Sequence, residues 1–322
     1  MPRSTPVATL GRLALISLGS LAAACGGEKA PPADSLAVAP LATEEALPAP
    51  TEGFKVPESV RYDAALDAYF VSNIDGVPSN KDNNGYIARL DAANPTTPTI
   101  VVKGGENGAT LHAPKGMAIA GDTLWVADID AVRAFDKITG ATLATIDLAP
   151  LGATFLNDVA IAPDGVVYVT DTGIRISDTG EVTHPGKDRV FAISGGKASV
   201  ALEGDDILTR PNGIAWDATG GRFILVPFGG NGISAWKPGE TTVSSVSTGP
   251  GTYDGVEVLA DGRILVTSWA DSSLNVVSNS ALTRLAGGLE APADIGVDTK
   301  RSRVAVPRFN AGRIDYVAIP AK

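Results

Sequence analysis

Three segments of the sequence place an amide or a carboxylate directly before an apolar run. They read LNDVAIAPDG from Leu156, RPNGIAWD from Arg210 and YDGVEVLADG from Tyr253. In each segment a turn and a second apolar run follow, as in an antiparallel hairpin. A polar side chain at the entrance of a buried strand costs free energy unless it has a partner. The pattern therefore points to a polar or metal-binding site that several hairpins share.

These hairpins belong to a pattern that returns six times between Gly53 and the end of the chain. Aligned by the first apolar position, the repeats begin at Val60, Met117, Val159, Ile214, Val256 and Ile295, with 39 to 57 residues between successive members. A period of about 40 to 50 residues with four short strands is typical of a propeller blade. The sequence therefore predicts an all-β fold over residues 53–322, a six-bladed β-propeller with four-stranded blades.

The last blade has only three strands before the chain ends. The segment TEGFKV, which begins at Thr51, is expected to supply its fourth strand and to close the ring, because this would cover otherwise exposed strand edges. Two polar insertions, GVPSNKDNNG in the first blade and RISDTGEVTHPGKDR in the third, are expected on a face of the disc, where propellers bind ligands.

The innermost strands of a propeller line its axis, so equivalent residues of different blades converge there. The position two before each aligned apolar residue is occupied by Glu58, Lys115, Asn157, Asn212, Asp254 and Ala293. Four of these six side chains offer oxygen ligands, which a hard divalent cation would satisfy together. Ca²⁺ accepts six to eight oxygens in irregular geometry, whereas Mg²⁺ suits such a set less well. The sequence predicts a Ca²⁺ site; the opposing interpretation is that these side chains cap strand ends.

Zn²⁺ is disfavoured because it prefers His or Cys ligands. The two histidines, His112 and His184, lie outside the predicted ring, and the single cysteine, Cys25, lies near the N-terminus. Lys115 leaves three outcomes open. Its ammonium could point away from the ring, pair with Glu58 or Asp254 in place of a metal, or act in proton transfer with a lowered pKa.

The motifs VPESVRYD, LNDVAIAPDG, RPNGIAWD and YDGVEVLADGRILVTSW resemble, in order, those of the senescence marker protein/gluconolactonase/luciferin-regenerating enzyme family. More distant likeness extends to diisopropylfluorophosphatase and paraoxonase. The resemblance implies metal ligation by Glu58, Asn157, Asn212 and Asp254, with Asp254 as general base or nucleophile. Lys115 departs from the neutral polar residue usual in the family.

The resemblance implies hydrolysis of a lactone, ester or phosphoester whose carbonyl or phosphoryl oxygen is polarised by the metal. The ends of the second strands are expected to form the substrate pocket through Asn73, Asp128, Asp171, Phe228, Trp269 and Arg308. Arg308 is the predicted contact for an anionic group on the substrate.

Two other functions fit a propeller, because the fold alone does not determine function. The first is a non-catalytic binding module whose axis is plugged by Lys115 and whose insertions recognise a partner. The second is a condensing enzyme similar to strictosidine synthase, which ranks last because it would lack the four-ligand ring.

Composition and the N-terminus bear on partners and location. The net charge of −10 disfavours nucleic acid and anionic membranes as partners. The expected partner is a small-molecule substrate, and the protein is expected to be a monomer. Residues 1–25 have the charge and hydropathy pattern of an export signal, and LAAAC resembles a lipobox with Cys25 as the lipidated residue.

Residues 26–52, rich in Pro and Ala, are expected to form a spacer. The prediction is an exported protein in the periplasm or at the cell surface, held by its lipid in the outer membrane. The membrane is then contacted only through this anchor.

Overall fold

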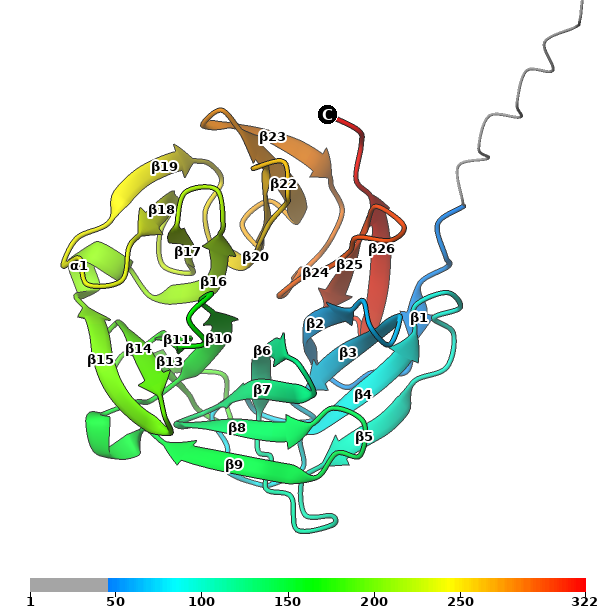
Figure 1. Ribbon diagram of the computed structural model, residues 1–322, viewed down its shortest axis with the longest axis vertical. Coiled ribbons are helices and arrows are strands. Elements are labelled where there is room, and N and C mark those ends of the chain that lie inside the picture. Colours follow the sequence, from blue (N-terminus) through cyan, green and yellow to red (C-terminus); the bar gives the residue numbers. More distant parts are fainter. Residues whose placement is uncertain (1–45) are drawn as a thin grey trace, which may run out of the picture. The chain divides into compact units, whose positions relative to one another are not determined.

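The computed structural model describes residues 46–322, which form six four-stranded antiparallel sheets around a central axis (Figure 1). The predicted six-bladed, all-β propeller is confirmed. The predicted leader, its Cys25 and the spacer as far as residue 45 lie outside the described residues. Within residues 46–322, no helix has the length and apolar character needed to cross a bilayer.

Each of the first five blades is a four-stranded antiparallel sheet built outward from the axis. The first two blades consist of β2 (Pro57–Asp63), β3 (Ala68–Asn73), β4 (Tyr86–Asp91) and β5 (Thr99–Lys103), then β6 (Pro114–Ala120), β7 (Thr123–Asp128), β8 (Ala131–Asp136) and β9 (Thr142–Asp147). The third contains β10 (Leu156–Ile161), β11 (Val167–Asp171), β14 (Arg189–Ser194) and β15 (Lys197–Glu203). The fourth and fifth contain β16 (Pro211–Asp217), β17 (Arg222–Pro227), β18 (Gly232–Trp236), β19 (Ser244–Thr248), β20 (Tyr253–Val258), β21 (Ile264–Ser268), β22 (Ser273–Ser278) and β23 (Ala281–Ala286).

The sixth blade is assembled from both ends of the described chain. It contains β24 (Gly296–Asp298), β25 (Arg303–Arg308) and β26 (Arg313–Ala318), and its outermost strand is β1 (Thr51–Glu52). The pairing of Thr51 with Ile314 closes the ring, as predicted for the TEGFKV segment. The predicted spacer ended at Glu52, so its last two residues belong instead to the propeller. The reason is that β26 would otherwise leave an open edge.

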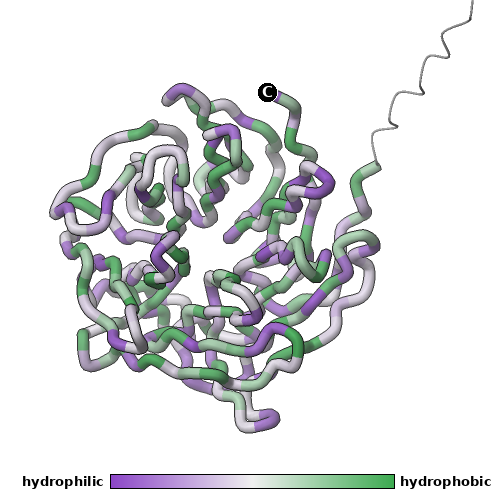
Figure 2. Tube along the Cα trace, viewed as in Figure 1, coloured by the Kyte–Doolittle hydropathy of each residue, from purple (hydrophilic) through white to green (hydrophobic). Residues whose placement is uncertain are grey.

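The hydrophobic core lies between neighbouring blades. One cluster joins Phe70 and Ile87 of the first blade to Met117 and Phe135 of the second, and similar clusters join the blades around the ring. Strands near the axis, such as β3, are buried along their whole length, whereas outer strands such as β9 are mostly exposed. Hydrophobic and hydrophilic residues are interspersed along the chain in all blades (Figure 2).

Three short elements lie outside the blades. The third-blade insertion forms a hairpin of β12 (Arg175–Ile176) and β13 (Val182–Thr183). The other two are a 3-10 helix, η1 (Ala149–Leu151), and a single helical turn, α1 (Asp205–Leu208). The hairpin matters for function because it reaches the axial cavity described below.

Candidate functional site

A β-bulge interrupts the innermost strand of five blades at the residue predicted to face the axis. In β10, for example, Leu156 pairs with Asp171 and Val159 pairs with Val169, so Asn157 and Asp158 stand opposite one residue. The same irregularity occurs in β2, β6, β16 and β20. Because a bulge turns a side chain out of the regular alternation, it allows an inner strand to aim one residue at the axis.

The five bulged positions converge on one cavity. Glu58, Asn157, Asn212 and Asp254 are each 4% exposed, Lys115 is 1% exposed, and all five line the same space of about 80 Å³. Ala293, the sixth residue of the ring, is buried but does not line the cavity. The structure thus brings together the four predicted metal ligands and Lys115.

Three of the four predicted ligands have a buried oxygen without a hydrogen-bond donor in the described part of the chain. These atoms are Glu58 Oε2, Asn212 Oδ1 and Asp254 Oδ1. The fourth, Asn157, donates its Nδ2 to Thr172 Oγ1 at 3.0 Å, which leaves the carbonyl end of the amide for a ligand. Buried polar atoms are normally paired, so convergent unpaired oxygens at one site call for an explanation.

The pKa shifts of the two carboxylates in the ring also indicate a site that favours a positive partner. Burial is the main cause that raises the pKa of Glu58 well above its ordinary value, and the carboxylates of Asp254 and Asp294 raise it further. Burial and Asp294 likewise raise the pKa of Asp254. Trp269 and Asn212 partly oppose that rise, but neither completes a hydrogen bond of normal geometry to Asp254 Oδ1. Clustered, desolvated carboxylates of this kind favour a bound cation.

The backbone around the ring is tightly packed. A Cβ added to Gly213 would lie 2.5 Å from the Asp254 carbonyl oxygen, and one added to Gly255 would lie 2.6 Å from Asp294 Cα. The Asn-Gly and Asp-Gly pairs are therefore strand residues that let inner strands approach closely, and they do not form turns. Val56, Arg210, Thr252 and Ala291, each two residues before a ring position, have positive φ angles of 46° to 61°. Such strained residues gather at functional sites.

Lys115 does not pair with the acids of the ring. Its Nζ donates to the backbone oxygens of Pro78 at 3.1 Å and Ala113 at 3.2 Å, and lies 4.1 Å from the ring centroid of Phe155. Among the ion pairs of residues 46–322, none involves Lys115. Burial lowers its pKa to about 8, although Glu58 opposes the shift. The alternative in which Lys115 plugs the axis by neutralising the acids is contradicted by this geometry.

The axis is instead closed beneath the ring by Arg61. Its guanidinium contacts Asp158 at 3.0 Å and Asp294 at 2.9 Å, with Glu257 at 3.5 Å. It also donates to the backbone oxygens of Val60, Met117 and Ile295. The residues that hold Arg61 thus come from five of the six blades. This explains why a carboxylate follows Asn157 in the third blade: Asp158 belongs to a second layer that fixes Arg61 in the channel.

The predicted pocket residues of the second strands are wrong in four blades. Asn73, Asp128, Asp171 and Arg308 are buried but do not line the cavity, whereas Phe228 and Trp269 do. The pairing of the strands shows the cause. Asn73, Asp128, Asp171, Pro227, Ser268 and Arg308 are equivalent, because each pairs with the residue before a ring position. The prediction was therefore one residue early in four blades, and a slip of one residue turns a strand side chain to the other face.

The residues that do reach the cavity follow one position later. They are Ile74, Thr172, Phe228, Trp269 and Phe309, together with Pro78, Phe155, Ile174 and Ile176 from the adjoining segments. Phe228 and Trp269 already occupy this later position, so the prediction mixed two registers, and the ladder pairing shows which of the two faces the cavity. In the other four blades the polar residues were selected for their chemistry, which favoured the wrong position.

The four displaced polar side chains have a shared structural role. Asp128 accepts hydrogen bonds from the backbone of His112 and Ala113, and Asp171 accepts them from Thr154 and Phe155. Asn73 accepts one from Lys55 N, and Arg308 donates to Glu290 O. Each therefore holds the segment that leads into a ring residue. Arg308 also pairs with Asp315 at 2.6 Å, so it is not free to bind an anionic substrate.

Two insertions meet over the cavity. Ile176 N donates to Ser79 Oγ at 2.9 Å, and Asn80 Nδ2 donates to Asp178 Oδ1 at 2.6 Å, which joins the first-blade insertion to the β12–β13 hairpin. Pro78 and Ile176 from these insertions line the cavity. The insertions thus cover the site, which agrees with the prediction that they lie on the ligand-binding face.

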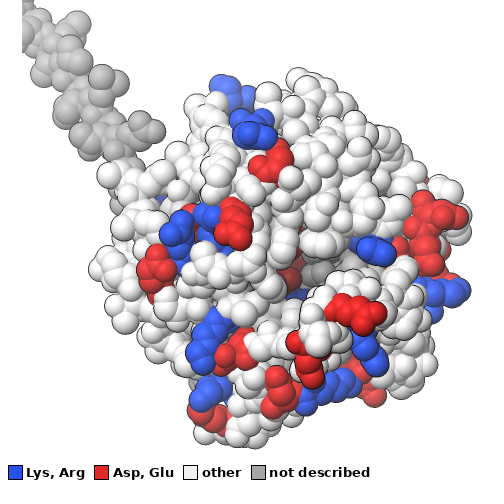
Figure 3. All heavy atoms as spheres, turned by 180° about the vertical axis from the view of Figure 1, so that it is seen from behind, with Lys and Arg blue, Asp and Glu red and all other residues white. Residues whose placement is uncertain are grey.

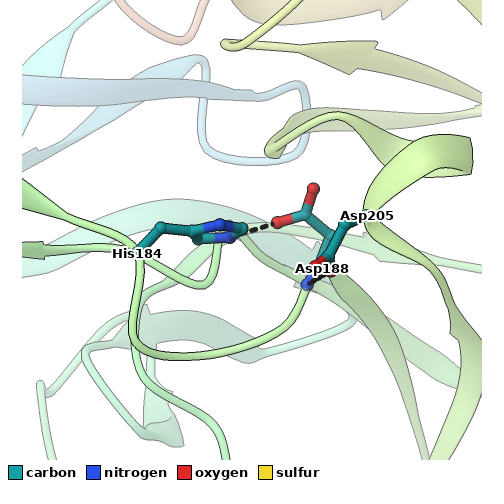
Figure 4. A group of neighbouring side chains, drawn as sticks. All are labelled: His184, Asp188 and Asp205. Carbon is teal, nitrogen blue, oxygen red and sulfur yellow. Dashed lines mark hydrogen bonds and ion pairs between the residues drawn. The ribbon is translucent and has the colours of Figure 1, made fainter.

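A second group of possible ligands, His184, Asp188 and Asp205, lies outside the ring (Figure 4). His184 Nε2 lies 2.8 Å from Asp188 Oδ1, and Asp205 Oδ1 accepts the backbone N–H of Asp188. Asp188 Oδ2 also accepts a hydrogen bond from Arg210 N. His184 and Asp188 pair with each other and Asp205 holds the backbone of Asp188, so the group is explained as a tie between the third-blade insertion and the segment before β16.

The charged side chains on the face shown in Figure 3 form small groups of mixed sign around the rim, and the face is hollowed near its centre. No extended field of one sign covers this face. The charged side chains of this face therefore do not form a binding surface of one sign, in contrast to the acids gathered at the buried axial site.

The fold and the axial oxygens define the class: a six-bladed propeller with an acidic pocket on its axis. The chain belongs to the SMP-30/gluconolactonase/LRE-like family, whose model matches residues 56–295. This confirms the resemblance read from the sequence motifs.

Solved structures support the fold at low identity. A gluconolactonase from Xanthomonas campestris aligns with a TM-score of 0.65 and 16% identity, over 84% of this chain and 88% of that chain. A calcium-binding regucalcin from Agrobacterium tumefaciens aligns with a TM-score of 0.62 and 15% identity, over 85% and 94% respectively. A chain of a nidogen/laminin complex aligns at 0.55 and 17%, over 71% and 79%. No curated protein sequence matches significantly.

Proposed function

We propose that this protein is a hydrolase of lactones or related esters that uses a divalent cation, most suitably Ca²⁺, held on the propeller axis. The observation that carries the proposal is the convergence of Glu58 Oε2, Asn212 Oδ1 and Asp254 Oδ1, all buried and without a donor, at the floor of one cavity. Membership of the family and the likeness to a gluconolactonase support the activity, and the likeness to a calcium-binding regucalcin supports the choice of cation.

The donor set fits a hard cation. Two carboxylates and two amide carbonyls provide oxygen ligands only, and the cavity beside them leaves room for water or substrate oxygens. A cation would also offset the repulsion that raises the pKa of Glu58 and Asp254. Lys115 leaves this position open because its ammonium is bound by carbonyl oxygens at the wall.

The bound cation would supply Lewis acidity toward the carbonyl oxygen of the substrate. Asp254 lines the cavity and is placed to accept the proton of the attacking water through the carboxylate oxygen that would not ligate the cation. The water oxygen forms a bond to the carbonyl carbon, the ring C–O bond breaks, and the leaving alkoxide takes the proton that Asp254 had accepted, which gives a hydroxy acid. Lys115 contributes positive charge at the wall, and the insertions limit access of bulk water.

The test begins with thermal unfolding of the full chain in excess Ca²⁺ and in chelator. A ligand at about 100 times its Kd stabilises by about 2.7 kcal/mol, which for a domain of this size raises Tm by about 5 °C or more. The shift and the Ca²⁺-dependent lactone hydrolysis should both be lost in Glu58→Gln. Glu257→Gln, a change to an acid outside the cavity, is the matched control and should retain both.

Absence of a Ca²⁺ shift in the wild-type protein, together with no metal in the purified sample, would overturn the metal-dependent mechanism. A non-catalytic binding module would then be the better interpretation. Retention of the full shift in Glu58→Gln would remove Glu58 from the ligand set.

The location of the protein is a separate proposal, supported by the sequence of its first 25 residues. We propose export and lipid attachment at Cys25, followed by retention in the outer membrane. Metabolic labelling with a radioactive fatty acid should mark the wild-type protein and leave Cys25→Ala unlabelled. Equal labelling of both proteins would refute the assignment.

A further inference from the structure

The walls of the axial cavity are apolar, although its floor is charged. Phe228, Trp269 and Phe309 from three successive blades form a contiguous aromatic wall. The ring centroids of Phe228 and Trp269 are 5.5 Å apart, and those of Trp269 and Phe309 are 5.4 Å apart. Ile74, Ile174, Ile176 and Pro78 complete the lining from the first and third blades. Above the floor, the surface offered to a ligand is therefore largely hydrocarbon.

Most polar groups that reach the walls already have hydrogen-bond partners. Thr172 Oγ1 donates to Pro211 O at 2.8 Å and accepts from Asn157 Nδ2. Lys115 has committed two of its three N–H groups to backbone oxygens. The indole N–H of Trp269 completes no hydrogen bond within residues 46–322, but it lies beside Asp254 and so belongs to the floor. Hydroxyl groups on a substrate would find few free donors or acceptors along these walls.

We infer that the substrate is a lactone or ester whose non-reacting part is an alkyl or aryl group, and not a polyhydroxylated sugar lactone or an anionic ester. This inference rests on the hydrolase proposed above and specifies its substrate class. An alkyl chain gains by leaving water for the aromatic wall. A sugar lactone loses, because its hydroxyls would be buried without partners. An anionic substituent would find only the Lys115 ammonium, which already donates to two backbone oxygens, since Arg308 lies outside the cavity.

The test compares three δ-lactones that share a six-membered ring. δ-Valerolactone carries no substituent, δ-nonalactone carries a butyl chain, and glucono-δ-lactone carries hydroxyl groups. Each buried methylene is expected to raise kcat/KM about fourfold. With the Ca²⁺-loaded full chain, δ-nonalactone should therefore exceed δ-valerolactone at least tenfold. Glucono-δ-lactone should fall below both.

A substitution in the β12–β13 hairpin tests whether the apolar character of the wall, and not merely the integrity of the hairpin, sets the substrate preference. Ile176 lines the cavity at the end of the short strand β12, so Ile176→Ser adds a hydroxyl to the wall without touching the ring. It should reduce the preference for δ-nonalactone over δ-valerolactone by at least about threefold. Val182→Ser is the matched control on the same hairpin, because Val182 is 53% exposed and does not line the cavity. This variant should keep the wild-type preference.

The possible outcomes separate a wrong substrate class from a wrong enzymatic activity. Ca²⁺-dependent hydrolysis that favours glucono-δ-lactone, or that ignores the butyl chain, would overturn the substrate class and leave the hydrolase standing. Failure to hydrolyse any of the three lactones, despite a demonstrated Ca²⁺ shift, would overturn the lactone hydrolase and this inference with it. An unchanged preference in Ile176→Ser would refute the role of the wall.

Discussion

Arg61 offers the sharpest test of how the propeller is held together. Its side chain is 11% exposed, and its guanidinium contacts Asp158 and Asp294, which are 1% and 2% exposed. Replacing Arg61 by Met keeps most of the apolar volume and removes the positive charge. Two carboxylates then remain in the channel without their cation, next to the acids of the ring.

The expected loss follows from this geometry. Breaking a buried ion pair by removing one partner typically costs about 3 to 5 kcal/mol, because the remaining charge is desolvated and unpaired. At about 2 to 4 °C per kcal/mol for a domain of this size, Arg61→Met should lower Tm by about 6 to 20 °C. The backbone oxygens of Val60, Met117 and Ile295 lose their donors as well, so the upper part of the range is expected.

The assay is thermal and denaturant unfolding in chelator, so that metal binding does not contribute. Arg222→Met is the matched control: its pair with Asp217 is 34% exposed on the Arg side and should contribute less than about 1 kcal/mol. Adding Asp294→Asn to Arg61→Met should recover part of the loss, because one stranded carboxylate is removed. The reasoning is refuted if Arg61→Met costs no more than Arg222→Met, or if Asp294→Asn only adds to the damage.

Two further predictions concern the backbone and the pH dependence of stability. Gly213→Ala should destabilise the fold by about 1 to 3 kcal/mol and weaken the Ca²⁺ shift, since its Cβ would lie 2.5 Å from the Asp254 carbonyl oxygen. A calcium titration that compares Gly213→Ala with Gly221→Ala tests this contact. Gly221→Ala is the control because it meets no neighbouring atom and only the strain of its φ of 59°. Burial raises the pKa of Glu257 from 4.5 to about 7, so the folded state binds the proton more tightly and this residue's contribution to stability falls between about pH 4.5 and pH 7. The side chain of Glu257 is 26% exposed, which keeps this change in the free energy of unfolding below about 3 kcal/mol. Urea unfolding across this pH range should show that the stability of Glu257→Gln depends less on pH than that of the wild type. Parallel pH profiles for the two proteins would contradict the assignment.

The sequence by itself determined the fold and the axial ring. The number of times that the pattern of polar residue, apolar strand and turn recurs gives the number of blades, because each blade must present one inner strand to the axis. The same register placed Glu58, Asn157, Asn212 and Asp254 together, and the cavity contains all four. The unfinished sixth blade likewise identified β1 as the closing strand. These features depend on spacing along the chain, which the sequence displays directly.

Only the tertiary structure decided the walls and the channel beneath the ring. At the ends of the second strands, polar and apolar residues are adjacent, and a shift of one position exchanges Asn73 for Ile74 and Arg308 for Phe309. The ladder pairing resolves that choice, and no local pattern does. Arg61 meets Asp158 and Asp294 only after the ring closes, across separations of 97 and 233 residues. Contacts between distant blades depend on how the sheets curve and how the ring closes. The role of Arg61 in the channel and the apolar character of the pocket therefore follow only from the folded ring.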